Sequence, residues 1–425
     1  MRGLTDNRRF IIAFGLLLII TLGYIDRVNM SVAAPHIIDQ FDLSTGQFGL
    51  ITSVFNWAYI VFLVPVGMMA DRWGARLILP ISIIVWSLGA GLTGGALGLT
   101  MLVIARLLLG AGESSVYPVG NLVVREWAPS KERGIFTGML NAGALVGPAV
   151  GAVIAAYLIA AWGWRASFFI LGAAGILVGI VWSIVYTTPE KSRWLTNTER
   201  QFILENRDSP ITPDGAAKLS VVALLRMRTI WGLMITQGCA VYTNYLFLSF
   251  LPLYLTTEKG LKDVGSGWVT GITYGIAAVG SVGIAYISDR AVKNTDVLSG
   301  SRRKIVSLTL LLGLPLLALP WVGNFALVVI LISWILLVIT AAITLNFALA
   351  GDLTTDKSSG GRVFALVTFG GNLFGLLAPI ITGYLVDWTS GYTAPFLVAG
   401  VLLLIGSFTS RYLSNRPLQR SEVAA

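Results

Sequence analysis

The sequence predicts an all-α integral membrane protein with twelve transmembrane helices in two six-helix bundles. Three observations predict it: the composition, the lengths of the apolar stretches, and one long polar connection near the middle of the chain. Of 425 residues, only 12% are charged and 55% are hydrophobic, and the mean hydropathy is +0.78. A globular domain carries about 25% charged residues because its surface faces water. The composition therefore indicates a chain whose solvent is lipid.

The apolar stretches have the length of membrane-spanning helices. A helix needs about 20 mostly apolar residues to cross a hydrocarbon layer of about 30 Å. Strands are not expected, because the stretches are too long and lack the alternation typical of membrane barrels. Stretches of this kind occur at 10–33, 45–70, 77–97, 100–124, 134–158, 165–187, 229–256, 265–288, 304–322, 325–350, 361–387 and 391–412.

The basic residues predict how these helices are oriented. The termini and the even-numbered connections hold 25 of the 30 Lys and Arg residues, the odd-numbered connections hold three, and two lie within spans. Positively charged loops stay on the cytoplasmic side during insertion. We therefore expect a multi-pass protein of the inner (plasma) membrane with both termini in the cytoplasm. The net charge of +9 then reflects topology, and no nucleic-acid partner is expected.

The connection at residues 191–228 is the longest and carries charges of both signs, with a short surface helix expected at 197–206. It divides the chain into an N-terminal bundle, 1–190, and a C-terminal bundle, 229–425. A repeat supports this division. Gly67-Met-Met-Ala-Asp71-Arg72-Trp-Gly74-Ala-Arg76 follows the second span, and Ala285-Tyr-Ile-Ser-Asp289-Arg290 follows the second span of the other half.

Four ionisable residues lie deep inside the spans: Asp26 and Arg27 on the first, and Arg106 and Glu113 on the fourth. Each costs about 2.5–3.5 kcal/mol at the bilayer centre on insertion scales. The helical rise places Asp26 and Arg106 at similar depths, and Glu113 nearer the middle, within reach of Arg27. We predict an exchangeable set in which Asp26 pairs with Arg106 and Glu113 with Arg27. Buried ion pairs stabilise less well than apolar packing, so a functional role is favoured over a merely structural one.

Such a set predicts proton-coupled uptake of an anion. The planar guanidinium of Arg binds a carboxylate through two parallel hydrogen bonds. When an anionic substrate binds the Arg, the carboxylate is released and takes up a proton. The scheme needs no cofactor, only the proton as coupling ion. With one Cys, one His and no G-x-x-x-x-G-K-[ST] sequence, neither a metal site nor an ATP-binding loop is expected.

The segment Gly67–Arg76 fits the pattern G-x-x-x-D-R-x-G-x-R throughout, and the whole chain resembles the major facilitator superfamily. The resemblance implies a site between two bundles and alternating access by rocking. Physically, Gly67 would let two helices approach closely. Asp71 can accept hydrogen bonds at a helix end and can pair with a cytoplasmic Arg such as Arg133. The resemblance assigns these residues to a gate that closes the cytoplasmic face: Gly67, Asp71, Arg72, Arg76 and Arg133.

Two further segments narrow the resemblance. Tyr24–Pro35 and Arg106–Arg133 look like the first and fourth helices of the anion:cation symporters, whose bacterial members import sugar acids such as galactonate, glucarate and hexuronates. The family pattern implies proton binding by Asp26 and Glu113 and charge pairing by Arg106. It implies substrate binding by Tyr24, Arg27, Tyr59 and Asn372. Weaker substrate candidates are Asn244, Tyr245 and Asn346, since Asn and Tyr also tie helices together.

The sequence departs from the family at the fifth span, which has Asn141-Ala-Gly-Ala144 where sugar-acid members often have Asn-Ser-Ala-Gln. Without that Gln, aromatic or dicarboxylic acids remain open as substrates. The expected partners are a small organic anion, protons and lipid, and we expect a monomer. Other interpretations are a drug or sugar-phosphate antiporter and a passive facilitator. A membrane enzyme is not expected, because it would need a catalytic group such as a Ser–His arrangement, and the only His is expected near the surface.

Overall fold

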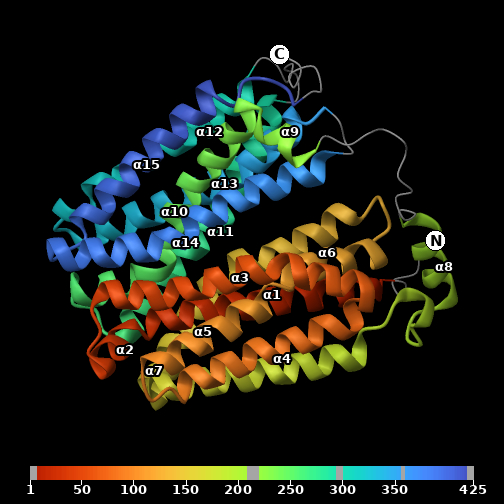
Figure 1. Cartoon of the computed structure of the whole chain (residues 1–425), viewed down its shortest axis with the longest axis horizontal. Coiled ribbons are helices and arrows are strands. Elements are labelled where there is room, and N and C mark those ends of the chain that lie inside the picture. The colour runs from red at the N-terminus through yellow and green to blue at the C-terminus, as the bar shows by residue number, and fades with distance from the viewer. Residues whose placement is uncertain (1–6, 208–219, 293–299, 356–358, 419–425) are drawn as a thin grey trace. The chain divides into compact units, whose positions relative to one another are not determined.

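The structure is a computed structural model that describes residues 7–207, 220–292, 300–355 and 359–418. These residues are helical almost throughout, and the only β-type pairing among them is an isolated bridge between Thr354 and Leu418. Eleven helical segments in the described part of the chain are long and apolar enough to cross a membrane. The prediction of an all-helical, multi-pass membrane protein is confirmed (Figure 1).

Apolar side chains dominate each long helix, and short turns separate them. In the first half the elements are α1 (Arg9–Val32), α2 (Ala34–Phe41), α3 (Thr45–Trp73), α4 (Ala75–Gly94), α5 (Leu99–Glu113), α6 (Val116–Trp127), α7 (Arg133–Val185), the 3-10 turn η1 (Pro189–Lys191) and α8 (Asn197–Asn206). In the second half they are α9 (Val221–Leu225), α10 (Arg228–Thr257), α11 (Asp263–Val292), α12 (Ser301–Leu311), the 3-10 segment η3 (Leu314–Trp321), α13 (Phe325–Leu353), α14 (Gly360–Thr389) and α15 (Thr393–Tyr412).

The segment α7 contains two of the predicted spans without a loop between them. Its 53 residues would measure about 80 Å as one straight helix, far more than the hydrocarbon layer of about 30 Å. The backbone reverses at Gly163, whose φ of 81° and ψ of 163° lie outside the helical region. Glycine adopts a positive φ without steric cost. With two crossings in α7 and one in each of the ten other segments, the structure accounts for the twelve predicted spans.

Proline explains why the predicted span 100–124 appears as two helices, α5 and α6. The helix breaks at Ser114 and Ser115, and Pro118 lies four residues after the first of them. A proline removes the hydrogen bond to the carbonyl four residues earlier and clashes with it. The break follows directly after Glu113, which therefore stands at the end of α5.

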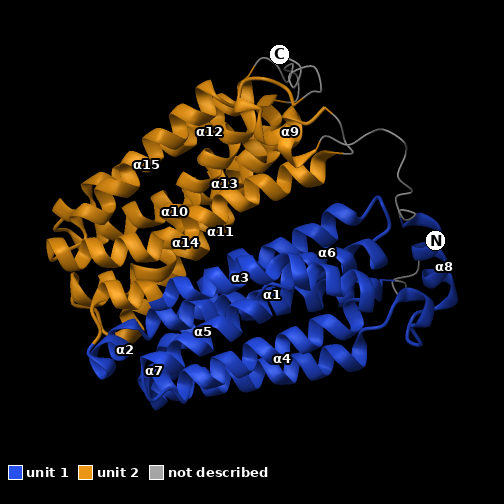
Figure 2. Cartoon of the chain, in the orientation of Figure 1, with its two compact units in different colours: residues 1–42, 51–214 blue, residues 43–50, 215–425 orange. Residues whose placement is uncertain are grey.

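Contacts divide the chain into two compact units, shown in Figure 2. Unit 1 contains residues 1–42 and 51–214, and unit 2 contains residues 43–50 and 215–425. In unit 1, α7 packs on α1 and α4, and α4 also packs on α5. In unit 2, α10 packs on α14 and α15, and α11 packs on α13. The first turns of α3 belong to unit 2, which the predicted division did not include. The predicted boundaries of the two bundles stay a prediction.

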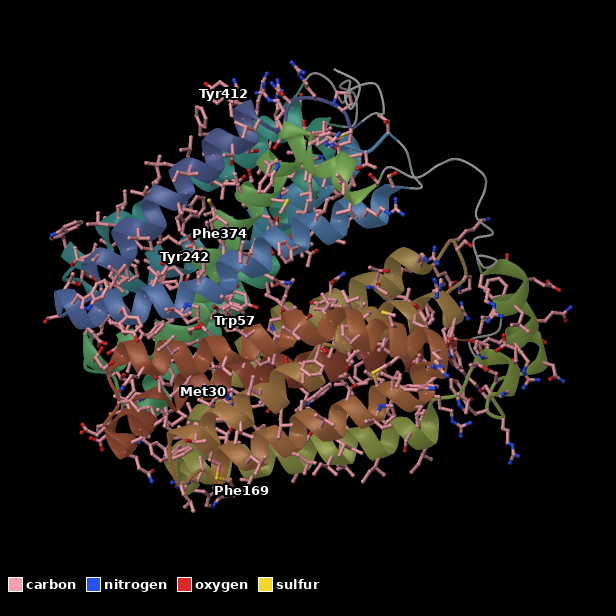
Figure 3. The ribbon with its side chains drawn as sticks, viewed as in Figure 1. Met30, Trp57, Phe169, Tyr242, Phe374 and Tyr412 are labelled. Carbon is pink, nitrogen blue, oxygen red and sulfur yellow. The ribbon has the colours of Figure 1, made fainter. Side chains whose placement is uncertain are left out.

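Large apolar side chains are exposed along the outer surfaces of the helices. Phe169 and Tyr412 are 51% and 55% exposed, whereas Met30 and Tyr242 are buried within their units (Figure 3). Exposed apolar surface on this scale is not found on a soluble monomer. It matches the prediction that lipid surrounds the helices.

The short helix expected at 197–206 is present as α8, with the same bounds. Thr196 caps it by accepting a hydrogen bond from the backbone N–H of Glu199 at 3.2 Å. Arg9, at the start of α1, donates to Glu199 at 3.0 Å and to Glu132 at 2.7 Å. The Glu199 side chain is fully buried. The charged connection is thus fastened to unit 1 through a buried arginine.

Candidate functional site

An ion pair lies inside unit 1, where α1 and α5 carry the four ionisable residues of the apolar spans. Nε of Arg27 donates a hydrogen bond of 2.7 Å to Oε2 of Glu113. The Glu113 side chain is 1% exposed, and that of Arg27 is 11% exposed. The Glu113 carboxyl group lies against Gly23, one turn before Arg27. A Cβ added at Gly23 would lie 3.4 Å from the carboxyl carbon of Glu113. The predicted contact of Glu113 with Arg27 is confirmed, and the exchange of partners stays a prediction.

Three aromatic rings surround the Arg27 guanidinium. Its central carbon lies 4.6 Å from the ring centroids of Tyr24 and Phe55, and 5.4 Å from that of Tyr59. Each ring face attracts a cation. Tyr24 and Tyr59 are predicted site residues, while the sequence reasoning missed Phe55. Its signal is its position four residues before Tyr59, which puts both rings on one face of α3.

The predicted pair of Asp26 with Arg106 is not formed, and this expectation was wrong. Both carboxylate oxygens of Asp26 are buried without a hydrogen-bond partner among the described residues. Nη2 of Arg106 instead donates to Oγ1 of Thr93, on α4, at 2.9 Å. Asp26 and Arg106 still attract each other electrostatically. The sequence missed Thr93 because a hydroxyl on a neighbouring helix leaves no charge signal.

This arrangement suits reversible binding of an anion. Arg27 is partly exposed and offers a planar fork of donors, which matches a carboxylate. Its present partner, Glu113, is held by one of its two oxygens, and the other has no hydrogen-bond partner among the described residues. An incoming anion would compete with Glu113 for the same cation. In the described ranges, no three His, Cys, Asp or Glu side chains come together as metal ligands.

Unit 2 holds the remaining substrate candidates. Asn346 is 1% exposed, and its amide nitrogen donates to Gln237 Oε1 at 2.9 Å and to the Leu233 carbonyl at 3.0 Å. These bonds tie α13 to α10. Gln237 is a polar partner that the sequence reasoning missed. The other candidates are partly exposed, and their roles stay predictions: Asn244 and Tyr245 on α10, and Asn372 on α14.

Four of the five predicted gate residues lie at the end of α3 and the start of α4, and the fifth, Arg133, begins α7. Asp71 is exposed and forms no hydrogen bond or ion pair with another described residue, so the expected pair with Arg133 is not formed. Gly67 also differs from expectation. A Cβ there would meet Pro118 at 3.5 Å, an ordinary contact that requires no glycine. Gly74, with φ of 80°, does require one.

The remaining two gate residues, Arg72 and Arg76, are exposed, and the Arg72 guanidinium lies 5.7 Å from the ring centroid of Trp73. The repeated segment of unit 2 is the one that forms ion pairs. Arg302 bonds Asp289 at 2.8 Å and Asp352 at 2.6 Å. The two copies of the repeat therefore differ in their pairing within their own units.

Comparisons with known proteins identify the family and the fold. Residues 16–356 match the family model described as Major Facilitator Superfamily. The chain is 30% identical to the Probable L-galactonate transporter of Escherichia coli over 93% of this chain and 87% of that protein. It is 29% identical to the Probable sulfoacetate transporter of Cupriavidus necator, over 92% of this chain and 91% of that protein. A solved bacterial homologue of the human lysosomal transporter Spinster has the same fold, with a TM-score of 0.81, 19% identity and 98% of each chain covered.

Proposed function

The chain belongs to the Major Facilitator Superfamily and is a multi-pass membrane transport protein, not an enzyme; on that premise, we propose that it imports a small organic carboxylate together with protons. The observation that carries the proposal is the Arg27 guanidinium, enclosed by aromatic rings and bonded to the buried Glu113. A cation maintained inside an apolar bundle is costly. Binding of an anionic substrate would explain why this arginine is present despite that cost.

The proton step follows from competition for Arg27. A substrate carboxylate forms two parallel hydrogen bonds with the guanidinium and displaces Glu113. The released Glu113 is then a buried carboxylate without a cation, which is strongly unfavourable, so it takes a proton from the side on which the substrate entered. Asp26, buried one residue before Arg27, is the second proton-binding group. Substrate and proton then cross the membrane together.

Two arguments support the substrate class. The relatives include proteins named as transporters of L-galactonate and of sulfoacetate, one rich in hydroxyl groups and one without any. The segment Asn141–Ala144 lacks the Gln common in sugar-acid symporters, which removes one donor and acceptor for a substrate hydroxyl. We therefore propose a carboxylate that ranges from a sugar acid to a smaller, less hydroxylated acid.

The remaining parts of the proposal concern the state of the protein. The distribution of Lys and Arg supports an inner-membrane location with both termini in the cytoplasm. The coupling ion is the proton, and no cofactor takes part. The protein works as a monomer.

The test is uptake into proteoliposomes that contain the purified chain. The probes are radiolabelled L-galactonate, D-glucuronate and sulfoacetate, each with an acidic exterior, with and without a protonophore. We expect at least one anion to accumulate above its external concentration, and the protonophore to abolish the accumulation. Arg27→Ala abolishes uptake of that anion, while Arg411→Ala, which changes an exposed arginine at the end of α15, leaves uptake in place.

Three outcomes would overturn the proposal. Equilibration without accumulation would identify a passive facilitator. Proton-driven efflux of a preloaded compound would identify an antiporter. Transport of a lipophilic cation in the same vesicles, without transport of any of the three anions, would identify a drug carrier.

A further inference from the structure

Thr93, on α4, is the only protein group that hydrogen-bonds Arg106 in the described part of the chain. Its side chain is fully buried. The hydroxyl donates to the Gly89 carbonyl at 2.9 Å and accepts from Nη2 of Arg106 at 2.9 Å. A threonine hydroxyl has one hydrogen and two acceptor positions. With its hydrogen committed to Gly89, Thr93 presents acceptor positions to the arginine.

The packing of α4 on α5 fixes this hydroxyl in place. A Cβ at Gly89 would lie 2.8 Å from the Leu109 nitrogen and 2.9 Å from the Ala105 oxygen, so the two backbones touch at that level. Thr93 lies one turn further along the same face of α4, where it meets Arg106. Beyond it, Arg165 donates to the Gly94 carbonyl at 2.8 Å. The end of α4 is therefore held from both sides.

Asp26 is the group that would otherwise bond Arg106. It is 1% exposed, and neither of its oxygens has a hydrogen-bond partner among the described residues. Nε of Arg106 is also buried without one. The two groups attract each other without touching. A buried carboxylate depends strongly on its donors, so the direction of the Arg106 guanidinium decides how Asp26 is compensated.

We propose that Thr93 is a positioning residue of the proton site. Its hydroxyl holds Arg106 in a hydrogen bond that competes with Asp26, and it thereby keeps the Asp26 carboxylate available to a proton. This inference rests on the proposed proton-coupled function. It adds a residue on α4 that neither the sequence pattern nor the relatives' names identify.

A substitution at Thr93 leaves the other charged groups near Asp26 unchanged. Glu113 and Arg106, both on α5, act on it electrostatically, and Arg27 follows it on α1 and is bonded to Glu113. Three further helices pack against α1, and α4 carries no titratable side chain beyond Arg76 at its start. The three helices that pack against α1 are α7, α6 and α2. Their titratable side chains are Arg133, Tyr157 and Arg165 on α7, Tyr117, Arg125 and Glu126 on α6, and His36 and Asp39 on α2.

Three variants separate the hydroxyl from the volume of the side chain. Thr93→Val keeps the shape and removes the acceptor, Thr93→Ala removes both the acceptor and the methyl group, and Thr93→Ser keeps the acceptor. Thr243→Val is the matched control, because Thr243 is also fully buried and donates to the carbonyl four residues earlier, that of Cys239, at 3.2 Å. Thr243 does not bond an arginine.

The experiment is an infrared titration of the purified full chain, with the proton as the probe. The carboxyl band of Asp26 is assigned by its loss in Asp26→Asn. Without the Thr93 hydroxyl, Arg106 turns to Asp26 and stabilises its charged form. We therefore expect the titration midpoint of that band to move to lower pH. The shift is about one pH unit, because the free energy of one hydrogen bond to a charged group corresponds to about that much. The optimum for uptake moves in the same direction. Thr93→Ser and Thr243→Val titrate like the wild type.

The proposal is overturned if Thr93→Val and Thr93→Ala titrate like the wild type, or if Thr93→Ser shifts the band as far as they do. Failure of the broader proposal looks different. If the wild type itself shows neither an Asp26 band nor pH-driven uptake, proton coupling at this site is wrong. If the wild type shows both and the Thr93 variants do not differ from it, only the role of Thr93 is wrong.

Discussion

Glu113 bonds Arg27 at 2.7 Å through one carboxylate oxygen, while its other oxygen is buried without a hydrogen-bond partner among the described residues. A buried polar pair maintained only for stability is expected to be fully satisfied, because each unpaired group lowers the free energy of unfolding. The pair of Glu113 with Arg27, in which Glu113 uses only one oxygen, is better suited to opening. We therefore expect variants of this pair to change coupling more than folding.

The first prediction concerns Glu113→Gln, which keeps the size of the side chain and an acceptor for Arg27 but cannot take up a proton. In a gradient of one pH unit, one coupled proton supports about tenfold accumulation, because one unit corresponds to about 1.36 kcal/mol. We expect Glu113→Gln to reduce accumulation to about the external concentration while substrate exchange across the membrane continues. Uptake and counterflow in the same vesicles measure the two activities.

The control for Glu113→Gln is Glu205→Gln, on the surface of α8, where Glu205 bonds Gln201. This variant is expected to accumulate substrate like the wild type. Wild-type accumulation by Glu113→Gln would show that Glu113 does not carry the proton.

The second prediction concerns the ring of Phe55, whose centroid lies 4.6 Å from the Arg27 guanidinium carbon. A cation over an aromatic face gains about 0.5–2 kcal/mol. Phe55→Leu keeps the apolar volume and removes the ring, so we expect the KM for the transported anion to rise about 2- to 30-fold. Phe62→Leu is the matched control, because Phe62 lies on the same helix but is 45% exposed. Equal KM values for the two variants would argue against a role for the ring.

The sequence predicts the helices well because their signal is local. Long apolar runs set the spans, and the Gly163 turn changes only how two of them are joined. The contact of Glu113 with Arg27 follows from helical rise alone. The bond of Arg106 to Thr93 does not, because it depends on how closely α4 approaches α5 at Gly89.

The gate shows the same limit in another form. The pattern Gly67–Arg76 identifies the segment, yet the exposed Asp71 has no ion-pair partner among the described residues. A pattern specifies which residues can pair and does not specify the conformation in which they do so. Gly74 is the exception, because its positive φ is a local requirement that the sequence records directly.

The third prediction concerns the anchor of α8. Arg9 bonds Glu132 and the fully buried Glu199, so Arg9→Met leaves a buried charge without its partner. Breaking such a pair costs about 3–5 kcal/mol, and we expect α8 to detach from the rest of unit 1 about 100- to 4,000-fold more often. Trypsin cleavage after Arg200 under native conditions measures this opening.

Arg8→Met is the control for Arg9→Met. Arg8 is exposed and donates to the Trp194 carbonyl, so its loss leaves no buried charge, and cleavage after Arg200 is expected to stay slow. If Arg9→Met is cleaved no faster than Arg8→Met, the buried pairs do not hold α8.

The last prediction concerns Gly110, where α5 meets α3. An added Cβ would lie 2.2 Å from the Phe55 carbonyl oxygen, so Gly110→Ala pushes the two helices apart and moves the ring that covers Arg27. Overpacking costs about 1–3 kcal/mol, and we expect both a lower Tm and a higher KM. Gly138→Ala on α7 is the control, because no atom lies within 4 Å of its added Cβ, and its Tm is expected to stay equal or rise. A lower Tm with an unchanged KM would separate the packing of α3 on α5 from the geometry around Arg27, and would contradict the coupling that we infer between them.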